Sequence, residues 1–153
     1  RPIHALCFFA LALAADAYPC WAEDCSDGFN IAVLKVEPIQ ASSRQGVVRA
    51  KVRLLNRGPC ELSASTLGNT CNLSVIYGAQ QYSAPLVVPF PWKGGKEVEA
   101  EVSISAPLRW GQQAVVTCIW ATANYTSDSD SDPSQDLNPR DNISASPVFF
   151  VGP

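Results

Sequence analysis

The stretch Gly46–Asn56 has the sequence GVVRAKVRLLN, in which apolar and basic side chains alternate. Successive side chains of an extended chain point to opposite faces. One face would carry four apolar residues: Val48, Ala50, Val52 and Leu54. The other face would carry three cations: Arg49, Lys51 and Arg53. This alternation predicts a β-strand with one buried and one solvent-exposed face, which the Asn56–Pro59 turn ends.

Other segments of the chain are also typical of β-strands. Apolar residues alternate with glutamates over 97–104, and residues 114–122 are apolar on both faces, as in a central strand. The remaining predicted strands are 29–37, which Pro38 would end, 73–77, 82–88 and 146–151. No amphipathic helix is evident, and twelve prolines and nine glycines supply turns. We expect an all-β protein, an antiparallel immunoglobulin-like β-sandwich of about seven strands, with a β-barrel as the alternative.

The second and fifth predicted strands carry opposite charges on their exposed faces. The second carries the three cations of the opening stretch, and the fifth carries three anions: Glu97, Glu99 and Glu101. In an immunoglobulin-like sandwich these strands are antiparallel neighbours, and facing rows of opposite charge favour that pairing. We therefore interpret the basic row as structural rather than as a surface for a sulfated or acidic glycan.

The first 22 residues have the features of a signal peptide. Arg1 and His4 precede an apolar run over residues 5–15, which is too short to span a bilayer. Small residues permit cleavage before Glu23 or before Tyr18. We expect residues 1–22 to be cleaved, with a buried N-terminal helix as the alternative. Residues 23–153 would then form a single domain without membrane insertion, located in the periplasm, at the cell surface or in the extracellular space.

Composition argues against several classes of function. The formal net charge is -3, whereas a nucleic acid or anionic membrane partner favours a basic protein. His4 is the sole histidine, which leaves the mature chain without the imidazole of a Ser-His-Asp triad or of a histidine metal site. No Ser-x-x-Lys motif is present either. We therefore expect a protein that is not an enzyme.

Three segments resemble a known family. They are the alternating strand that runs into Asn56-Arg57-Gly58, the Trp92–Lys96 turn before the acidic strand, and the acidic stretch Asp136–Ile143 before the last strand. Over residues 29–151 the chain is similar to the CARDB domain, a bacterial cell-adhesion-related module with a seven-stranded immunoglobulin-like sandwich. The insertion that carries Cys60 and Cys71 departs from the family pattern. The resemblance implies a non-catalytic module that binds or spaces other molecules at the cell surface.

Cysteine content agrees with export. Cleavage before Glu23 would leave four cysteines: Cys25, Cys60, Cys71 and Cys118. An even number predicts two disulfides in an oxidising compartment, and the absence of a C-x-x-C pair argues against a zinc ribbon or redox dithiol. In the immunoglobulin-like layout, the pairs Cys25–Cys60 and Cys71–Cys118 are favoured. The alternative is Cys60–Cys71 with Cys25–Cys118.

An acidic segment near the C-terminus is a candidate calcium site, because carboxylates at alternate positions present hard oxygen ligands. The candidate ligands are Asp128, Asp130, Asp132, Asp136 and Asp141. Pro133 and Pro139 replace the glycine and the bidentate glutamate of an EF-hand loop. A weak extracellular site is one interpretation, and a solvated acidic loop is the other.

Aromatic residues in or near predicted loops are candidates for glycan binding. They are Tyr77, Tyr82, Trp92, Trp110 and Tyr125, whereas we expect Trp120 in the core. The sequence as a whole therefore predicts an exported, non-catalytic binding, adhesion or structural module whose partner is a surface protein or a glycan. A secreted calcium- or glycan-binding domain is one alternative. An envelope or secreted inhibitor that presents a loop to a protein partner is the other.

Overall fold

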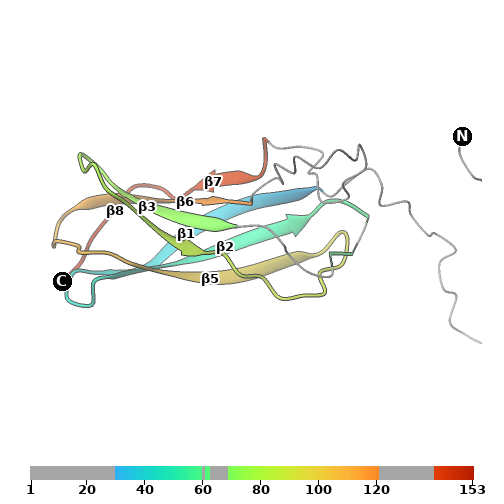
Figure 1. The fold of residues 1–153 in the computed structure, drawn as a ribbon, viewed down its shortest axis with the longest axis horizontal. Helices are drawn as coiled ribbons and strands as arrows, with labels where there is room; N and C mark the ends of the chain where they lie inside the picture. Colours follow the sequence, from blue (N-terminus) through green and yellow to red (C-terminus); the bar gives the residue numbers. More distant parts are fainter. Residues whose placement is uncertain (1–29, 60, 63–68, 121–139) are drawn as a thin grey trace, which may run out of the picture.

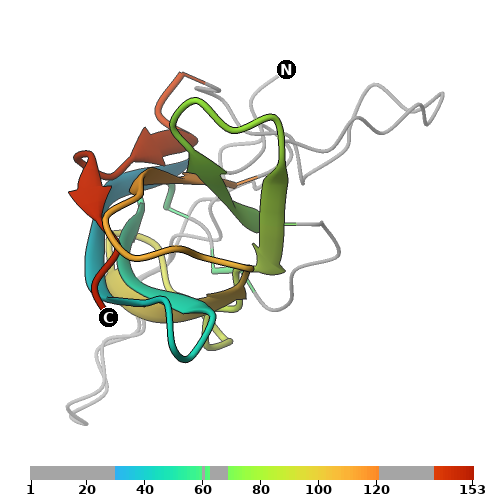
Figure 2. The ribbon, with the colours of Figure 1, turned by 90° about the vertical axis from the view of Figure 1, so that its left-hand side faces the viewer.

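The protein is described by a computed structural model over residues 30–59, 61–62, 69–120 and 140–153, which contain strands and no helix (Figure 1). The strands are β1 (Ile31–Ser42), β2 (Val47–Asn56), β3 (Thr70–Val75), β4 (Gln81–Pro85), β5 (Glu97–Ser105), β6 (Gln113–Ile119), β7 (Ile143–Ala145) and β8 (Phe149–Phe150). One antiparallel sheet has the order β1-β2-β5, and the other has the order β4-β3-β6-β7 with β8 also paired to β6. The two sheets enclose the core (Figure 2), which confirms the predicted all-β sandwich.

The alternation in the opening stretch sets the inward face of β2. Val48, Val52 and Leu54 are completely buried, and the cations between them point outward. On β5, Val102 and Ile104 face inward in the same way. Because each buried aliphatic side chain contributes roughly 1.5–3 kcal/mol, these two neighbouring strands supply a large share of the core stabilisation.

The first and the last predicted strands differ most from their predicted bounds. β1 continues through Pro38 to Ser42, so the prediction that Pro38 ends this strand is wrong. β1 lies at the edge of its sheet, and a register shift between Pro38 and Gln40 accommodates the missing N–H group. The predicted last strand is divided into β7 and β8, which pair with separate parts of β6. Between β7 and β8, the Ser146 hydroxyl accepts a hydrogen bond from the Val116 N–H at 3.0 Å. In a continuous strand, a backbone carbonyl would normally accept this hydrogen bond.

The predicted charge rows do lie on neighbouring strands. Backbone register places Lys51 opposite Glu101 and Arg53 opposite Glu99. The ion pairs nevertheless form on the diagonal: Arg49 with Glu101, Lys51 with Glu99 at 3.2 Å, and Arg53 with Glu97 at 3.7 Å. Diagonal partners lie within reach of long side chains in a twisted sheet. The structural interpretation of the basic row is therefore supported by its contacts.

β1 carries an ion pair of its own on this charged face. The ammonium group of Lys35 lies 3.0 Å from Glu37 and lowers the pKa of that carboxyl below its ordinary value of 4.5, first through a hydrogen bond and second through charge attraction. Both side chains are more than half exposed, so the contribution of this pair to folding is small.

A disulfide joins β3 to β6. Cys71 and Cys118 are directly opposite one another in the backbone register, and their Cα atoms are 4.0 Å apart. This pair is the one that the sequence favoured, and it excludes the alternative Cys60–Cys71 bond. Cys25 and Cys60 lie outside the described residues, so the second predicted pair stays a prediction.

The two sheets are joined along one side by backbone hydrogen bonds. The Val33 N–H donates to the Asp141 carbonyl at 2.8 Å, and Ser43 donates to Gly152 at 3.0 Å.

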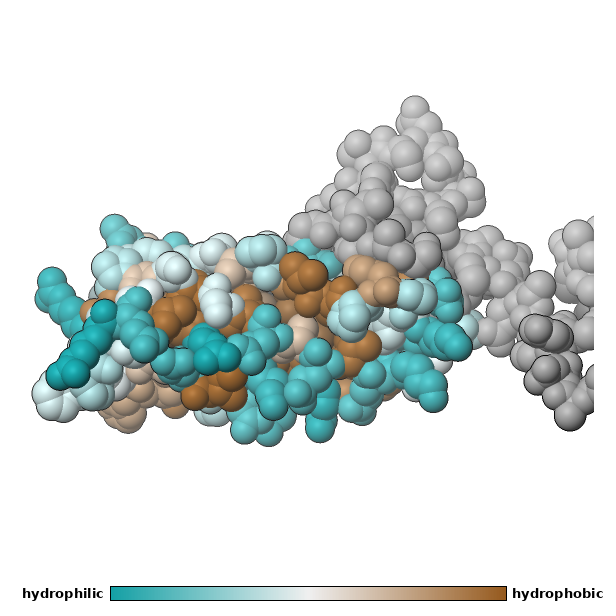
Figure 3. Space-filling view, turned by 90° about the horizontal axis from the view of Figure 1, so that it is seen from below, coloured by the Kyte–Doolittle hydropathy of each residue, from teal (hydrophilic) through white to brown (hydrophobic). Residues whose placement is uncertain are grey.

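β5 runs along the lower side in Figure 1. Seen from below, that side shows apolar patches among hydrophilic residues (Figure 3).

Candidate functional site

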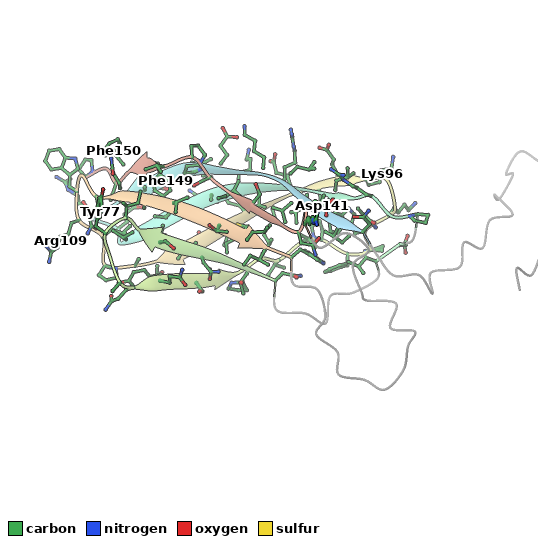
Figure 4. All side chains as sticks on the ribbon, turned by 90° about the horizontal axis from the view of Figure 1, so that it is seen from above. Tyr77, Lys96, Arg109, Asp141, Phe149 and Phe150 are labelled. Carbon is green, nitrogen blue, oxygen red and sulfur yellow. A yellow bond between two sulfur atoms is a disulfide. The ribbon has the colours of Figure 1, made fainter. Side chains whose placement is uncertain are left out.

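Three large aromatic or hydrophobic side chains project into solvent at one end of the sandwich. Their exposed fractions are 103% for Tyr77, 76% for Trp110 and 67% for Phe150. They come from the β3–β4 turn, the β5–β6 turn and β8. In Figure 4, Tyr77, Arg109 and Phe150 lie at the same end of the molecule, far from Lys96 and Asp141. We call this set the aromatic end.

Backbone contacts around Gln113 bring these segments together. The Ile76 N–H donates to the Gln113 carbonyl at 2.9 Å on one side, and Gln113 pairs with Phe150 on the other. The Gly111 N–H donates to the Val151 carbonyl at 2.8 Å. Since adjacent strands lie about 4.8 Å apart, the backbone segments that carry the three aromatic side chains lie within a few strand spacings of one another.

Tyr77 adopts a backbone conformation that its side chain does not favour. Its φ angle is 64°, in the left-handed region where glycine and asparagine are preferred. For other residues that region costs roughly 1–2 kcal/mol. A fully exposed ring gains no packing energy to offset this cost, so folding alone gives no reason for a tyrosine here. Such departures from local preference are expected at functional positions.

Trp110 sits on a short, well-ordered turn. The Gln112 N–H donates to the Arg109 carbonyl at 3.2 Å, and the Gln112 side chain accepts from the Arg109 N–H at 2.7 Å. Gly111 has a φ angle of 83°, which a residue with a side chain would adopt only with strain. The turn therefore holds the indole outward on a defined backbone.

The structure separates the five candidate glycan-binding residues. Tyr77 and Trp110 are exposed and share the aromatic end. Tyr82 is half-buried against the core and donates its hydroxyl hydrogen to Gln80 at 2.6 Å, so only part of its ring surface is open to a ligand. Tyr125 lies outside the described residues.

Trp92 is a core residue, and its prediction as a ligand residue is wrong. It is 1% exposed, and its ring meets that of Trp120 edge-on at 5.6 Å. Its indole N–H donates to the Lys96 carbonyl at 2.8 Å. The reason is tertiary, because the Trp92 backbone pairs with the sequence-distant Leu62 and its ring packs against Trp120. Trp120 is buried, as expected.

Phe150 was not singled out from the sequence. The pair Phe149-Phe150 in a predicted strand could have indicated an exposed ring. Adjacent strand residues point to opposite faces, so one of the two rings must face outward. Phe149 packs against the core and Phe150 is exposed.

Of the candidate calcium ligands, Asp141 alone falls within the described residues. Its carboxylate lies 3.4 Å from the Arg57 guanidinium at the end opposite the aromatic side chains. The other four, Asp128, Asp130, Asp132 and Asp136, lie outside. Within the described part of the chain, no three cysteine, histidine or acidic side chains gather closely enough to hold a metal ion. Calcium binding stays a prediction for the acidic segment.

Comparisons with protein-family models, with curated proteins and with solved structures yield no match for this chain. The CARDB resemblance therefore stays a prediction. The predicted leader, residues 1–22, also lies outside the described residues. In the described segments, no helix has the length and hydropathy needed to cross a bilayer.

Proposed function

We propose that this chain is an exported, non-catalytic binding or adhesion module that contacts its partner through the aromatic end. The observation that carries the proposal is Tyr77, whose strained backbone and fully exposed ring have no role in packing. Trp110 and Phe150 supply further exposed ring surface beside it. Aromatic side chains of this kind supply much of the binding energy at interfaces.

Two further observations support this proposal. The Cys71–Cys118 disulfide is typical of proteins in oxidising compartments, which agrees with export. Charged residues that pair with one another cover much of the outer face of the β1-β2-β5 sheet, which favours the aromatic end as the place where a partner binds.

Retention on immobilised ligands tests the proposal. The oxidised chain would be applied to cellulose, chitin, mannan, peptidoglycan, collagen and fibronectin, alongside Trp110→Ala and the control Val87→Ala. Val87 is 72% exposed, so it matches Trp110 in exposure, but its neighbour Leu86 bonds to Asn69 near the opposite end of β3. We expect Trp110→Ala to lose retention and Val87→Ala to keep it. Equal retention of both variants would refute the aromatic end as the binding site.

The β3–β4 turn favours a second candidate function, an inhibitor that presents a loop to a protein partner. Tyr77 lies at the tip of this turn and extends fully into solvent. In that case, Tyr77→Asn would abolish binding to the partner, while Trp110→Ala and Phe150→Ala would change it less than twofold. A comparable loss in all three variants would favour the binding module instead.

A further inference from the structure

The outward faces of the two sheets differ sharply in charge. Four cations and four anions cover the three-stranded sheet: Lys35, Arg49, Lys51, Arg53, Glu37, Glu97, Glu99 and Glu101. The register identifies the corresponding residues on the five-stranded sheet. Because Cys71 and Leu73 are completely buried, their neighbours on β3 point outward, together with the residues that pair with them on β4 and β6.

Among the residues that the structure describes, the outward face of the five-stranded sheet carries no charged side chain. Its members on all five strands are Thr70, Asn72, Ser74, Gln81, Ser83, Pro85, Gln113, Val115, Thr117, Ile119, Ile143, Ala145 and Phe150. We call this set the uncharged face. Depletion of charge together with exposed aromatic residues is the compositional mark of a binding surface.

This uncharged face has a polar half and an apolar half. β3 and β4 present hydroxyl and amide groups, which are ordered by hydrogen bonds: Ser83 donates to Asn72 at 2.6 Å, and Gln81 donates to Ser74 at 3.3 Å. β6, β7 and β8 present mainly aliphatic side chains and Phe150. A sugar ring has the same two kinds of surface, because its C–H groups form an apolar face and its hydroxyls form a polar rim.

We infer that the uncharged face binds a neutral polysaccharide chain, which reaches the aromatic end and stacks on its rings. The inference rests on the proposed binding function and names its ligand class. A sulfated or uronic polymer finds no cation among the residues of the uncharged face with which to pair, although the exposed Arg109 adjoins Trp110 at the aromatic end. The row Ile76–Gln113–Phe150 connects the sheet to Tyr77 and Trp110, so one extended chain can contact both regions.

A neutral polymer also accounts for the form of the aromatic end better than a folded protein does. At protein–protein interfaces the aromatic hot spots cluster near the centre, inside a ring of contacts that excludes water, and complementary charges orient the partner. Here the rings protrude beside a face that offers hydroxyl and amide groups but no charge.

Affinity electrophoresis tests the inference with soluble polymers of both kinds. The neutral probes are hydroxyethylcellulose and galactomannan, and the acidic probes are polygalacturonate and chondroitin sulfate. We expect a neutral polymer to retard the oxidised chain, with an affinity that changes less than twofold between about 0.05 and 0.5 M salt, since no ion pairs are involved. Trp110→Ala should weaken binding at least tenfold.

Two charge variants test whether the polymer binds to the uncharged face. Thr117→Glu introduces a carboxylate at its centre and should weaken binding at least tenfold, whereas Lys51→Glu on the opposite sheet should leave it within twofold. Circular dichroism would verify that both variants fold. If Thr117→Glu folds and binds like the unmodified chain, the uncharged face is not the site and the inference fails.

The remaining outcomes distinguish the two proposals. Salt-sensitive retardation by the acidic probes alone would overturn the neutral ligand. If no polymer retards the chain but collagen or fibronectin retains it in a Trp110-dependent manner, the proposal of a polysaccharide ligand fails. The proposal of a binding module is then retained. If Trp110→Ala changes binding to none of the polymers or proteins that retain the unmodified chain, both proposals fail.

Discussion

Trp92→Phe tests whether the buried tryptophan stabilises the fold, in contrast to the exposed Trp110. The substitution removes the indole N–H that donates to the Lys96 carbonyl at 2.8 Å, and that carbonyl keeps the N–H of Asn56 as a second donor. Losing one such hydrogen bond costs about 0.5–1.5 kcal/mol. The smaller ring also leaves a void of a few tens of Å³, which adds roughly 1 kcal/mol.

The expected loss in the free energy of unfolding is therefore about 1.5–2.5 kcal/mol, or roughly 6–10 °C in Tm for a domain of this size. Thermal unfolding followed by far-ultraviolet circular dichroism measures it. Trp110→Ala should lower Tm by no more than about 2 °C, since its exposed ring contributes little packing. An unchanged Tm for Trp92→Phe, or a larger loss for Trp110→Ala, would refute the assignment of these two side chains.

Two further substitutions test the charge rows and the disulfide. Glu99→Lys places a second cation beside Lys51 and should cost about 0.5–1 kcal/mol at low salt, a loss that the added exchange Lys51→Glu should restore; a loss that persists in the double variant would contradict the ion-pair interpretation. Replacing both Cys71 and Cys118 by alanine should lower the free energy of unfolding in urea by about 3–4 kcal/mol, because the bond closes a loop between residues 47 positions apart. A decrease below about 1 kcal/mol would show that the bond restricts the unfolded chain little.

Local patterns predicted much of the scaffold. The alternation in Gly46–Asn56 depends on the two-residue period of a strand, so it identified β2 and its buried face without knowledge of the partner strands. The opposite charges on β2 and β5 went further and predicted a contact between segments some fifty residues apart. The diagonal geometry of those ion pairs was beyond reach, because it depends on the twist of the sheet.

Solvent exposure was predicted less well than strand position. Trp92 and Trp110 both follow turn-forming sequences, and nothing in their immediate neighbours distinguishes them. The fold packs the Trp92 ring against Trp120 and pairs the Trp92 backbone with Leu62, whereas Trp110 stands on a turn that nothing in the described structure covers. Burial of a loop residue depends on which distant segment packs over it.

The pairing of Cys71 with Cys118 was one of two open alternatives, favoured by an assumed immunoglobulin-like layout and decided by the structure. The sequence itself established that the chain is all-β and that β2 and β5 attract one another. These properties follow from side-chain periodicity and charge, which are local or pairwise. The uncharged face and the aromatic end exist only in the folded protein. Both are assembled from strands and turns that are distant in sequence, and the antiparallel register of β3, β4, β6, β7 and β8 brings them together.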